Sequence, residues 1–476
     1  MKCAFVAMIL AGIVTVSVGV NAAEPSSYFR ADHGRAASDN ASLPTDFASK
    51  ANLAWQTPLA PGNSTPCVSG NSIFLTTWQK ESKELATVAL DRKTGKLRWK
   101  RVVPTTEIED FHTAGSPASA TSASDGRRVY SFFGSYGLLC YNFEGKLLWE
   151  HRLGPFQDEF GASSSPVLVD GKVILVEDHD IDSYLIAIDK LTGKQVWKTS
   201  RAGSTRSYAT PIVVETKSGG KQLIVAGSLQ ITGYNIETGK RIWWMNGLSR
   251  LVDPTPVFAN GLLYIATQTT GGDQSERISM GPFPDALKAY DKNGDSKVGK
   301  NELPAGDILT RFFRIDLDQD QKLDRDEWDK HARVFKQARN AALAVDPNGK
   351  GDVSDTHVKW VYRRSLPTVP SSVVYRGVMY MVKDGGIITS LDASNGQMLH
   401  QARAVGRGNY YASLVAGDGK VYLASERGVI TVLKAGTRFE TLASHDFAER
   451  MMATPVIAGG KMYVRTDAGL YVFGVR

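Results

Sequence analysis

Cysteine is scarce in this sequence. The 476 residues include three cysteines, of which Cys67 and Cys140 lie outside the first few residues. This low number excludes a small disulfide-stapled fold, and the absence of a Cys-x-x-Cys-His motif excludes covalent haem attachment. A single disulfide between Cys67 and Cys140 and two buried thiols both remain open, and we expect the buried thiols.

Clusters of basic residues are also absent. The formal net charge is +7, but lysine and arginine are scattered singly along the chain. Nucleic-acid binding typically needs a basic run or a basic stripe, so we expect no nucleic-acid partner. The hydrophobic content of 42% is enough to form a large core.

Long apolar runs are absent except at the start of the chain. Residues 4–20 are apolar, and Val20 and Ala22 occupy the small-residue positions of a signal-peptidase site. We therefore predict a cleavable signal peptide over residues 1–22, since a membrane anchor needs a longer run. Cys3 lies at the wrong end of this segment for lipid attachment. The sequence predicts a periplasmic or secreted protein without a membrane span.

The rest of the chain is a series of repeats. The first half of a repeat reads small residue, proline, apolar residues, a glycine turn and an apolar pair, and copies begin near positions 66, 117, 166, 211, 256, 372, 414 and 455. The second half reads Ala-x-Asp-x-x-Thr-Gly-Lys-x-x-Trp, as in 89–99 and 187–197. The Asp and Gly open a tight turn, and a strand ending in Trp follows it. Each of the eight units therefore predicts a four-stranded meander.

Such units close into a ring and remove their exposed edges. The last unit ends near Phe473 without its Trp strand, whereas residues 53–57 have the character of that strand. We predict an all-β fold, an eight-bladed β-propeller of four-stranded blades in which residues 53–57 complete the eighth blade. The tryptophans are expected to pack between blades.

The fifth unit is interrupted by about seventy additional residues. This interruption defines five predicted segments: a signal peptide (1–22), an N-terminal extension (23–52), blades one to five with the closing strand (53–269), an insertion (270–340) and the rest of the ring (341–476).

The repeated Ala-x-Asp-x-x-Thr-Gly-Lys-x-x-Trp unit resembles the PQQ-like repeat superfamily. That superfamily contains quinoprotein alcohol dehydrogenases as well as non-catalytic propellers of the BamB type. The resemblance covers residues 50–474 apart from the insertion, and it implies the propeller fold. It does not decide the function, because propellers host many unrelated activities.

Two twelve-residue stretches of the insertion carry oxygen ligands at positions 1, 3, 5 and 12 of a calcium loop. These residues are Asp291, Asn293, Asp295 and Glu302 in the first loop, and Asp316, Asp318, Asp320 and Glu327 in the second. Position 7, which offers its backbone carbonyl, is Lys297 or Lys322, and Asp324 stands at position 9 of the second loop. The spacing resembles that of EF-hand loops and predicts a pair of Ca²⁺ sites in a small α-helical insertion.

The residues around the loops agree with this interpretation. Position 8 is apolar in both loops, Val298 and Leu323, which predicts a short strand pairing between them. Residues 310–315 are typical of an entering helix. One face of a leaving helix is predicted to carry Trp328, Ala332, Phe335 and Arg339.

The two loops differ in charge and share one departure from the motif. Ser296 and Gln321 stand at position 6, where glycine normally allows a positive φ, and this costs about 1 kcal/mol in each loop. The second loop has five carboxylates, whereas the first has three beside Lys292, Lys297 and Lys300. We expect the second loop to bind calcium more tightly. Solvated acidic loops without metal are the alternative.

Three hypotheses remain for the function. The first is a calcium-binding, non-catalytic scaffold of the cell envelope, plausibly monomeric, whose rim binds a protein or a glycan. The second is a PQQ-dependent dehydrogenase. The resemblance implies that such an enzyme holds its quinone in the central channel, commonly against a disulfide between adjacent cysteines, and this chain has no adjacent cysteines. We expect no cofactor besides Ca²⁺.

The third hypothesis is a glycan-active enzyme that uses the rim. Its candidate residues are Glu177, Asp178, His179, Asp180 and Asp182, and a long loop that contains Glu107, Asp110 and His112. Either group could bind a cation or a sugar. Solvated polar loops are the plainer interpretation, and catalytic residues remain undetermined.

Overall fold

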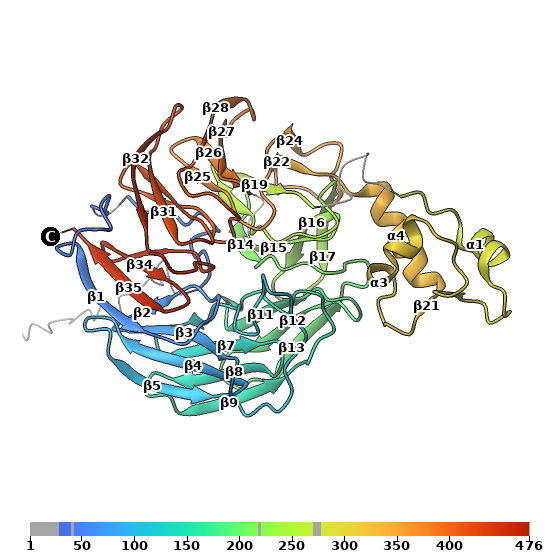
Figure 1. Ribbon diagram of the computed structural model, residues 1–476, viewed down its shortest axis with the longest axis horizontal. Helices are drawn as coiled ribbons and strands as arrows, with labels where there is room; N and C mark the ends of the chain where they lie inside the picture. The colour runs from blue at the N-terminus through green and yellow to red at the C-terminus, as the bar shows by residue number, and fades with distance from the viewer. Residues whose placement is uncertain (1–27, 40–41, 218–219, 270–277, 476) are drawn as a thin grey trace, which may run out of the picture.

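The computed structural model describes residues 28–39, 42–217, 220–269 and 278–475. The predicted signal peptide lies outside these residues. The described strands form a ring of blades, and the helices project from one side of the ring (Figure 1).

The first seven blades follow one another along the chain. Blade one consists of β2 (Cys67–Ser69), β3 (Ser72–Gln79), β4 (Glu84–Asp91) and β5 (Leu97–Val102), and blade two of β6 (Ala123–Ser124), β7 (Arg128–Phe133), β8 (Gly137–Asn142) and β9 (Leu147–Arg152). Blade three consists of β10 (Val167–Val169), β11 (Lys172–Glu177), β12 (Tyr184–Asp189) and β13 (Gln195–Ser200), and blade four of β14 (Ile212–Glu215), β15 (Lys221–Gly227), β16 (Gln230–Asn235) and β17 (Arg241–Asn246). Blade five consists of β18 (Val257–Ala259), β19 (Leu262–Thr267), β22 (Ala341–Val345) and β24 (Val358–Tyr362). Blade six consists of β25 (Val373–Tyr375), β26 (Val378–Lys383), β27 (Ile387–Asp392) and β28 (Met398–Arg403). Blade seven consists of β29 (Val415–Gly417), β30 (Lys420–Ala424), β31 (Val429–Lys434) and β32 (Glu440–Asp446).

The eighth blade joins the two ends of the described chain. It contains β33 (Val456–Ala458), β34 (Lys461–Arg465) and β35 (Gly469–Gly474), and its fourth strand is β1 (Leu53–Pro58). The pairing of β1 with β35 is antiparallel and runs from Leu53 with Phe473 to Pro58 with Gly469. The predicted eight-bladed propeller and the closing role of its N-terminal strand are confirmed.

Serine and threonine residues connect the blades around the channel. In most blades a backbone N–H donates a hydrogen bond of 2.9–3.0 Å to the hydroxyl of the equivalent residue in the next blade. These bonds join Thr65 to Thr121, Thr121 to Ser165, Ser165 to Thr210, Thr255 to Ser371, Ser371 to Ser413 and Ser413 to Thr454. They explain the small residue that precedes each repeat. The repeat start predicted at position 117 is wrong, because Pro117 belongs to the loop leading into blade two and β6 begins only at Ala123.

Tryptophans of the outer strands contact the following blade. The indole Nε1 of Trp99 donates to the Phe143 carbonyl at 2.8 Å, and the ring covers Gly145, where a Cβ atom would lie 2.7 Å from the indole. Gly145 also has a φ of 81°. The repeat glycine is therefore required by both the turn and the tryptophan. The prediction that the tryptophans pack between blades is confirmed.

Blade four has one strand more than predicted. The connection between β22 and β24 reaches over from blade five, and its strand β23 (Gly351–Asp352) pairs in parallel with β17 at Trp243 and Trp244. A strand of two residues has no apolar alternation, so the repeat pattern could not reveal it.

The N-terminal extension closes one end of the channel. Phe29 lines the narrow part of the channel together with the hydroxyl groups that connect the blades. Arg30 is buried and donates hydrogen bonds to the carbonyls of Leu414 and Ser372, in blades seven and six. The extension is thus a structural plug.

The insertion leaves the ring between β19 and β22, whose paired strands end at Thr267 and Ala341. It contains α1 (Phe283–Tyr290), β20 (Val298–Gly299), α2 (Asp307–Thr310), α3 (Phe312–Ile315), β21 (Lys322–Leu323) and α4 (Arg325–Gln337) (Figure 1). An apolar core of its own includes Phe283, Phe312 and Trp328. None of the described helices is long and apolar enough to cross a lipid bilayer.

Two helix predictions need correction. The helix expected over 310–315 is broken at Arg311 into two short turns, where φ is −104° and ψ is 9°. The leaving helix ends at Gln337, so Arg339 lies beyond it. The Phe335 side chain lies outside the described part of the structure, and Val334 and Ala338 pack against Leu229 of the ring.

Replacement of residues 272–338 by a short glycine-containing turn is expected to leave the propeller folded. The strands on either side are already paired at Thr267 and Ala341. The ring loses the small apolar contact at Leu229, which is worth about 1–2 kcal/mol, and polar contacts such as the hydrogen bonds of Gln157 and Gly203 to the insertion. Circular dichroism and a thermal melt test this. The expected result is one cooperative transition at a slightly lower temperature, and a molten or aggregated product would contradict it.

Candidate metal loops and channel mouth

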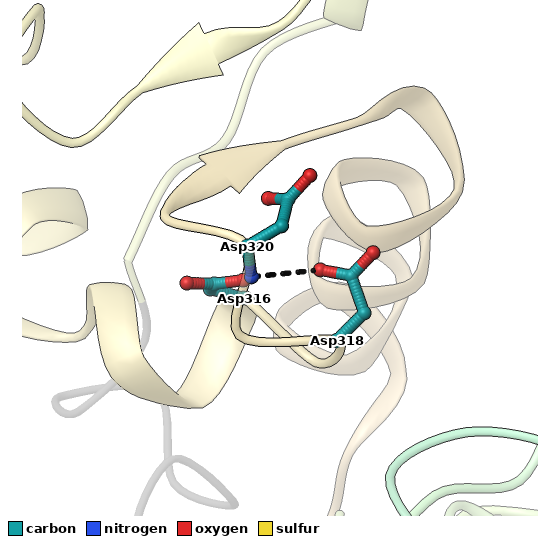
Figure 2. A group of neighbouring side chains, drawn as sticks. All are labelled: Asp316, Asp318 and Asp320. Atoms are coloured by element: carbon teal, nitrogen blue, oxygen red, sulfur yellow. Dashed lines mark hydrogen bonds between the residues drawn. The ribbon is translucent and has the colours of Figure 1, made fainter.

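Three aspartates of the second loop come together in front of β21. Their carboxylates each offer an oxygen atom within 4.8 Å of the others: Asp316, Asp318 and Asp320 (Figure 2). The Asp320 N–H donates to Asp318 Oδ1 at 3.1 Å, which fixes the turn of the loop. In the part of the chain that the structure describes, no other group of three acidic, histidine or cysteine side chains is arranged in this way.

The backbone of both loops agrees with the sequence prediction. Ser296 and Gln321 have φ values of 63° and 66°, so position 6 is left-handed without glycine. Val298 pairs with Leu323 in the short antiparallel sheet of β20 and β21. The predicted strand pairing between the loops is confirmed.

The glutamates at position 12 bind backbone amides in this structure. Glu327 Oε1 accepts the N–H groups of Leu317 at 2.6 Å and Asp318 at 3.2 Å, and Glu302 binds the start of the first loop similarly. Burial raises the pKa of Glu327 to about 7. Asp324 is the N-cap of α4, since its Oδ1 accepts the Glu327 N–H at 2.9 Å, and it does not join the three aspartates.

The position-7 lysines have a role that the motif did not reveal. Lys297 Nζ of the first loop lies 2.6 Å from Asp320 Oδ2 of the second, and Lys322 Nζ lies 2.7 Å from Asp295 Oδ2. Each loop therefore supplies a cation to the position-5 carboxylate of the other. The sequence does place a lysine two residues after the position-5 aspartate of each loop. It could not show that each lysine reaches the other loop, because the contact depends on the pairing of β20 with β21.

The polar cluster at 177–182 is mostly buried rather than solvated. Asp178 accepts hydrogen bonds from Arg201 Nε and Nη2 at 2.6 and 2.7 Å. Asp180 pairs in the same way with Arg206. Among the acidic and histidine residues of this cluster, only Asp182 is exposed. The expectation of solvated loops is wrong here because Arg201 and Arg206, in the connection between β13 of blade three and β14 of blade four, pair with the carboxylates.

His179 lies between two buried carboxylates. Its Nδ1 is 3.1 Å from Asp158 Oδ2 and its Nε2 is 2.9 Å from Glu177 Oε2. Burial opposes a charge on the imidazole, but the two carboxylates together raise the pKa of His179 to about 10. Asp158 also accepts the hydroxyl of Tyr208, a residue that lines the channel. These partners are distant in sequence, and no motif identifies them.

Glu109 lies beside this network and was not identified from the sequence, although its neighbours Glu107 and Asp110 were. Both of its carboxylate oxygens are buried and accept no hydrogen bond of normal geometry in the described chain. Burial raises the pKa of Glu109 to about 8, against the opposing effect of the His179 charge.

Glu109→Gln is expected to stabilise the protein increasingly as the pH rises. The folded protein keeps the Glu109 proton up to a pKa of about 8, whereas the unfolded chain releases it near 4.5. Folding therefore takes up a proton in this window, and wild-type stability falls there by at most about 1.4 kcal/mol per pH unit. Glutamine removes this loss. Urea unfolding of both proteins at several pH values is the test, and a difference that stays constant across the window would contradict it.

A cavity of about 440 Å³ opens at the mouth of the channel, away from the Phe29 plug. Loops of all eight blades and α3 of the insertion supply its walls. The charged, amide and aromatic lining residues are Asn63, His112, Glu159, Phe160, Tyr208, Arg250, Asp253, Arg314, Asp384, Asn409 and Tyr411. His112 is the one residue of the predicted 107–112 group among them.

The two cysteines of the described chain do not contribute to this cavity. Cys67 and Cys140 are buried in different apolar cores between blades and are not bonded to each other, so the expectation of buried thiols is confirmed. Burial raises the pKa of the Cys140 thiol to about 12. The described lining residues therefore do not fit a quinone that is held against a disulfide.

The ring matches a known family over most of its length. Residues 85–271 and 333–473 match the family described as outer membrane protein assembly factor BamB. The chain belongs to this family. The match omits most of the insertion, so membership in the BamB family concerns the ring. A comparison with curated proteins finds no match.

Solved structures of similar fold include BamB and alcohol dehydrogenases. BamB from Moraxella catarrhalis aligns with a TM-score of 0.55 and 10% identity over 89% of this chain and 98% of that one. A europium-containing methanol dehydrogenase gives 0.58 and 11% over 95% and 98%. The quinohemoprotein alcohol dehydrogenase from Comamonas testosteroni gives 0.57 and 13% over 95% and 81%. At these identities the similarity shows the fold alone.

Proposed function

We propose that the protein is an exported, calcium-binding, non-catalytic scaffold of the cell envelope. The observation that carries the proposal is the convergence of Asp316, Asp318 and Asp320 in a loop paired with a second one. Clustered carboxylate oxygens are the ligands that Ca²⁺ prefers. The predicted signal peptide and membership in the BamB family support the envelope location.

Each loop supplies the ligands of one EF-hand site in this proposal. The first site uses Asp291, Asn293, Asp295, the Lys297 carbonyl and Glu302, and the second uses Asp316, Asp318, Asp320, the Lys322 carbonyl and Glu327. The glutamates must turn from the backbone amides toward the ion. We expect Asp324 to reach the ion through a water molecule, because its Oδ1 already caps α4.

The scaffold function assigns partner binding to the rim of the propeller. The family description, an assembly factor for outer membrane proteins, supports a protein partner, and a glycan is the alternative. The test is a pull-down from an envelope fraction with tagged mature protein, with and without chelator, beside a Glu302→Gln/Glu327→Gln variant. Specific proteins should be recovered with calcium and lost with chelator and in the variant. Recovery no better than with the tag alone would contradict a scaffold.

A PQQ-dependent dehydrogenase is the second candidate, because enzymes of this class share the fold. We expect the purified protein neither to retain the quinone nor to reduce an artificial electron acceptor with alcohols or aldoses. The reason is that Cys67 and Cys140 lie in the core and not at the channel. Stoichiometric quinone recovery with quinone-dependent dye reduction would overturn this and favour the enzyme.

A further inference from the structure

The channel-mouth cavity has the size and the walls of a small-molecule site. Its volume of about 440 Å³ falls within the range of about 300–1,000 Å³ that is typical of such sites. Phe160, Tyr208 and Tyr411 line it with aromatic rings from blades three, four and seven. Asn409 and Asp384 add an amide and a carboxylate. Flat apolar faces beside polar groups suit the ring and the hydroxyls of a sugar.

Positive charge is concentrated on one side of this cavity. Arg250 and Arg314 line it. Burial, together with the nearby charges of Arg314, Arg206 and Arg311, lowers the pKa of Arg250 to about 10. Burial and the same four arginines lower the pKa of His331 to about 3. The potential at this wall therefore favours an anion.

Arg206 and Arg314 differ in their contacts with the nearby carboxylates. Arg206 donates hydrogen bonds of 2.9 Å to both acidic residues, from Nη1 to Glu159 Oε2 and from Nη2 to Asp180 Oδ2. Arg314 Nη2 is 3.8 Å from Glu159 Oε1, which is too long for a hydrogen bond, and Arg314 Nε is buried without a hydrogen-bond partner in the described chain. Burial raises the pKa of Asp253 to about 7, so this carboxyl is only partly charged near neutral pH.

We propose that the cavity binds a small polyhydroxylated carboxylate, of the sugar-acid class. Its carboxylate binds Arg314, because charge-assisted hydrogen bonds from a guanidinium group suit this planar anion. Its ring packs against Phe160 and the tyrosines, and its hydroxyls bond to Asn409 and Asp253. Binding of this kind requires no chemistry at the ligand, so it is compatible with a non-catalytic ring.

Calorimetry on the full mature protein tests the ligand class. The probes are glucuronate, galacturonate and gluconate, with glucose as the neutral sugar, acetate as the simple carboxylate and PQQ as the quinone of this fold. At least one sugar acid should bind about tenfold or more tighter than glucose and acetate. The proposal is overturned if no sugar acid binds at millimolar concentration, if glucose or acetate binds equally well, or if PQQ displaces the sugar acids.

Two arginines of the insertion provide a matched pair of variants. Arg314→Gln removes the guanidinium at the cavity and should weaken sugar-acid binding by about tenfold or more. Arg333→Gln is the control, since Arg333 Nη2 donates to the Gly203 carbonyl at 2.7 Å and does not line the cavity. Thermal melts verify that both variants are folded. Equal effects of the two substitutions, or none from Arg314→Gln, would assign the binding to another surface.

Discussion

Glu327→Gln is expected to abolish the tighter of two calcium-binding steps. A position-12 glutamate supplies two oxygens to the ion, and the amide offers neither charge nor a bidentate carboxylate, so a loss of about a hundredfold or more is expected. We expect the second loop to be the tighter site because its five carboxylates should attract a divalent ion more strongly than the three of the first loop. Each loop also holds one lysine against the other's aspartate, so these ion pairs affect both sites alike. Calorimetric titration of chelator-treated protein measures both steps.

Glu302→Gln is the matched control for this prediction. It removes the equivalent carboxylate of the first loop and should weaken only the weaker step. Because Val298 and Leu323 pair the loops, the Glu327 variant should also lose some affinity at the first site. If Glu302→Gln removes the tighter step and Glu327→Gln leaves it intact, the argument from ligand charge is wrong.

Asp178→Asn is expected to lower the free energy of unfolding by about 3–5 kcal/mol. The substitution leaves the Arg201 guanidinium charged and buried, after loss of the carboxylate that accepts its Nε and Nη2 hydrogens. An asparagine oxygen replaces only one of these acceptors and carries no charge. Urea unfolding at neutral pH gives the difference directly.

The control for the buried pair is Asp170→Asn. Asp170 pairs with Lys221 at 2.5 Å, but both side chains are about two-fifths exposed, and exposed pairs contribute about 0–1 kcal/mol. Asparagine also tolerates the positive φ of 43° at this position. If the two substitutions cost the same, burial of the Asp178–Arg201 pair would not be the cause of its effect.

The ring could be predicted because its information is local and repeated. Each blade places a serine or threonine at the channel, and five blades place a hairpin glycine under a tryptophan of the neighbouring blade, so the copies reinforce one pattern. The start of the second repeat was predicted wrongly because its copy of the pattern is degenerate. Blade two has Ser122 in place of the proline, and Pro117 in the preceding loop was taken for the start of the repeat. The parallel strand β23 at Gly351 was not predicted because it is too short to show an apolar pattern.

The two parts of the candidate site differed for a similar reason. The proposed calcium ligands of each loop lie within twelve consecutive residues, so their spacing is visible in the sequence. The positively charged side of the channel-mouth cavity combines Arg206, Arg250 and Arg314. These residues come together only because the loops that lead into blades four and five converge with α3. His179 was likewise predicted to lie in a solvated loop, since nothing in the adjacent sequence indicates that Asp158 would contact its imidazole.

The strand that closes the ring also determines how the ring responds to mechanical load. Leu53 pairs with Phe473, so β1 enters and β35 leaves at the same end of the eighth blade. Tension applied between residues 53 and 474 therefore pulls across the strands and opens their hydrogen bonds one after another, instead of shearing all of them at once. Phe47 packs edge to face on Phe473, with 5.0 Å between ring centroids. When tension comes through the N-terminal extension, this aromatic contact must separate before the zipper of β1 and β35 can open.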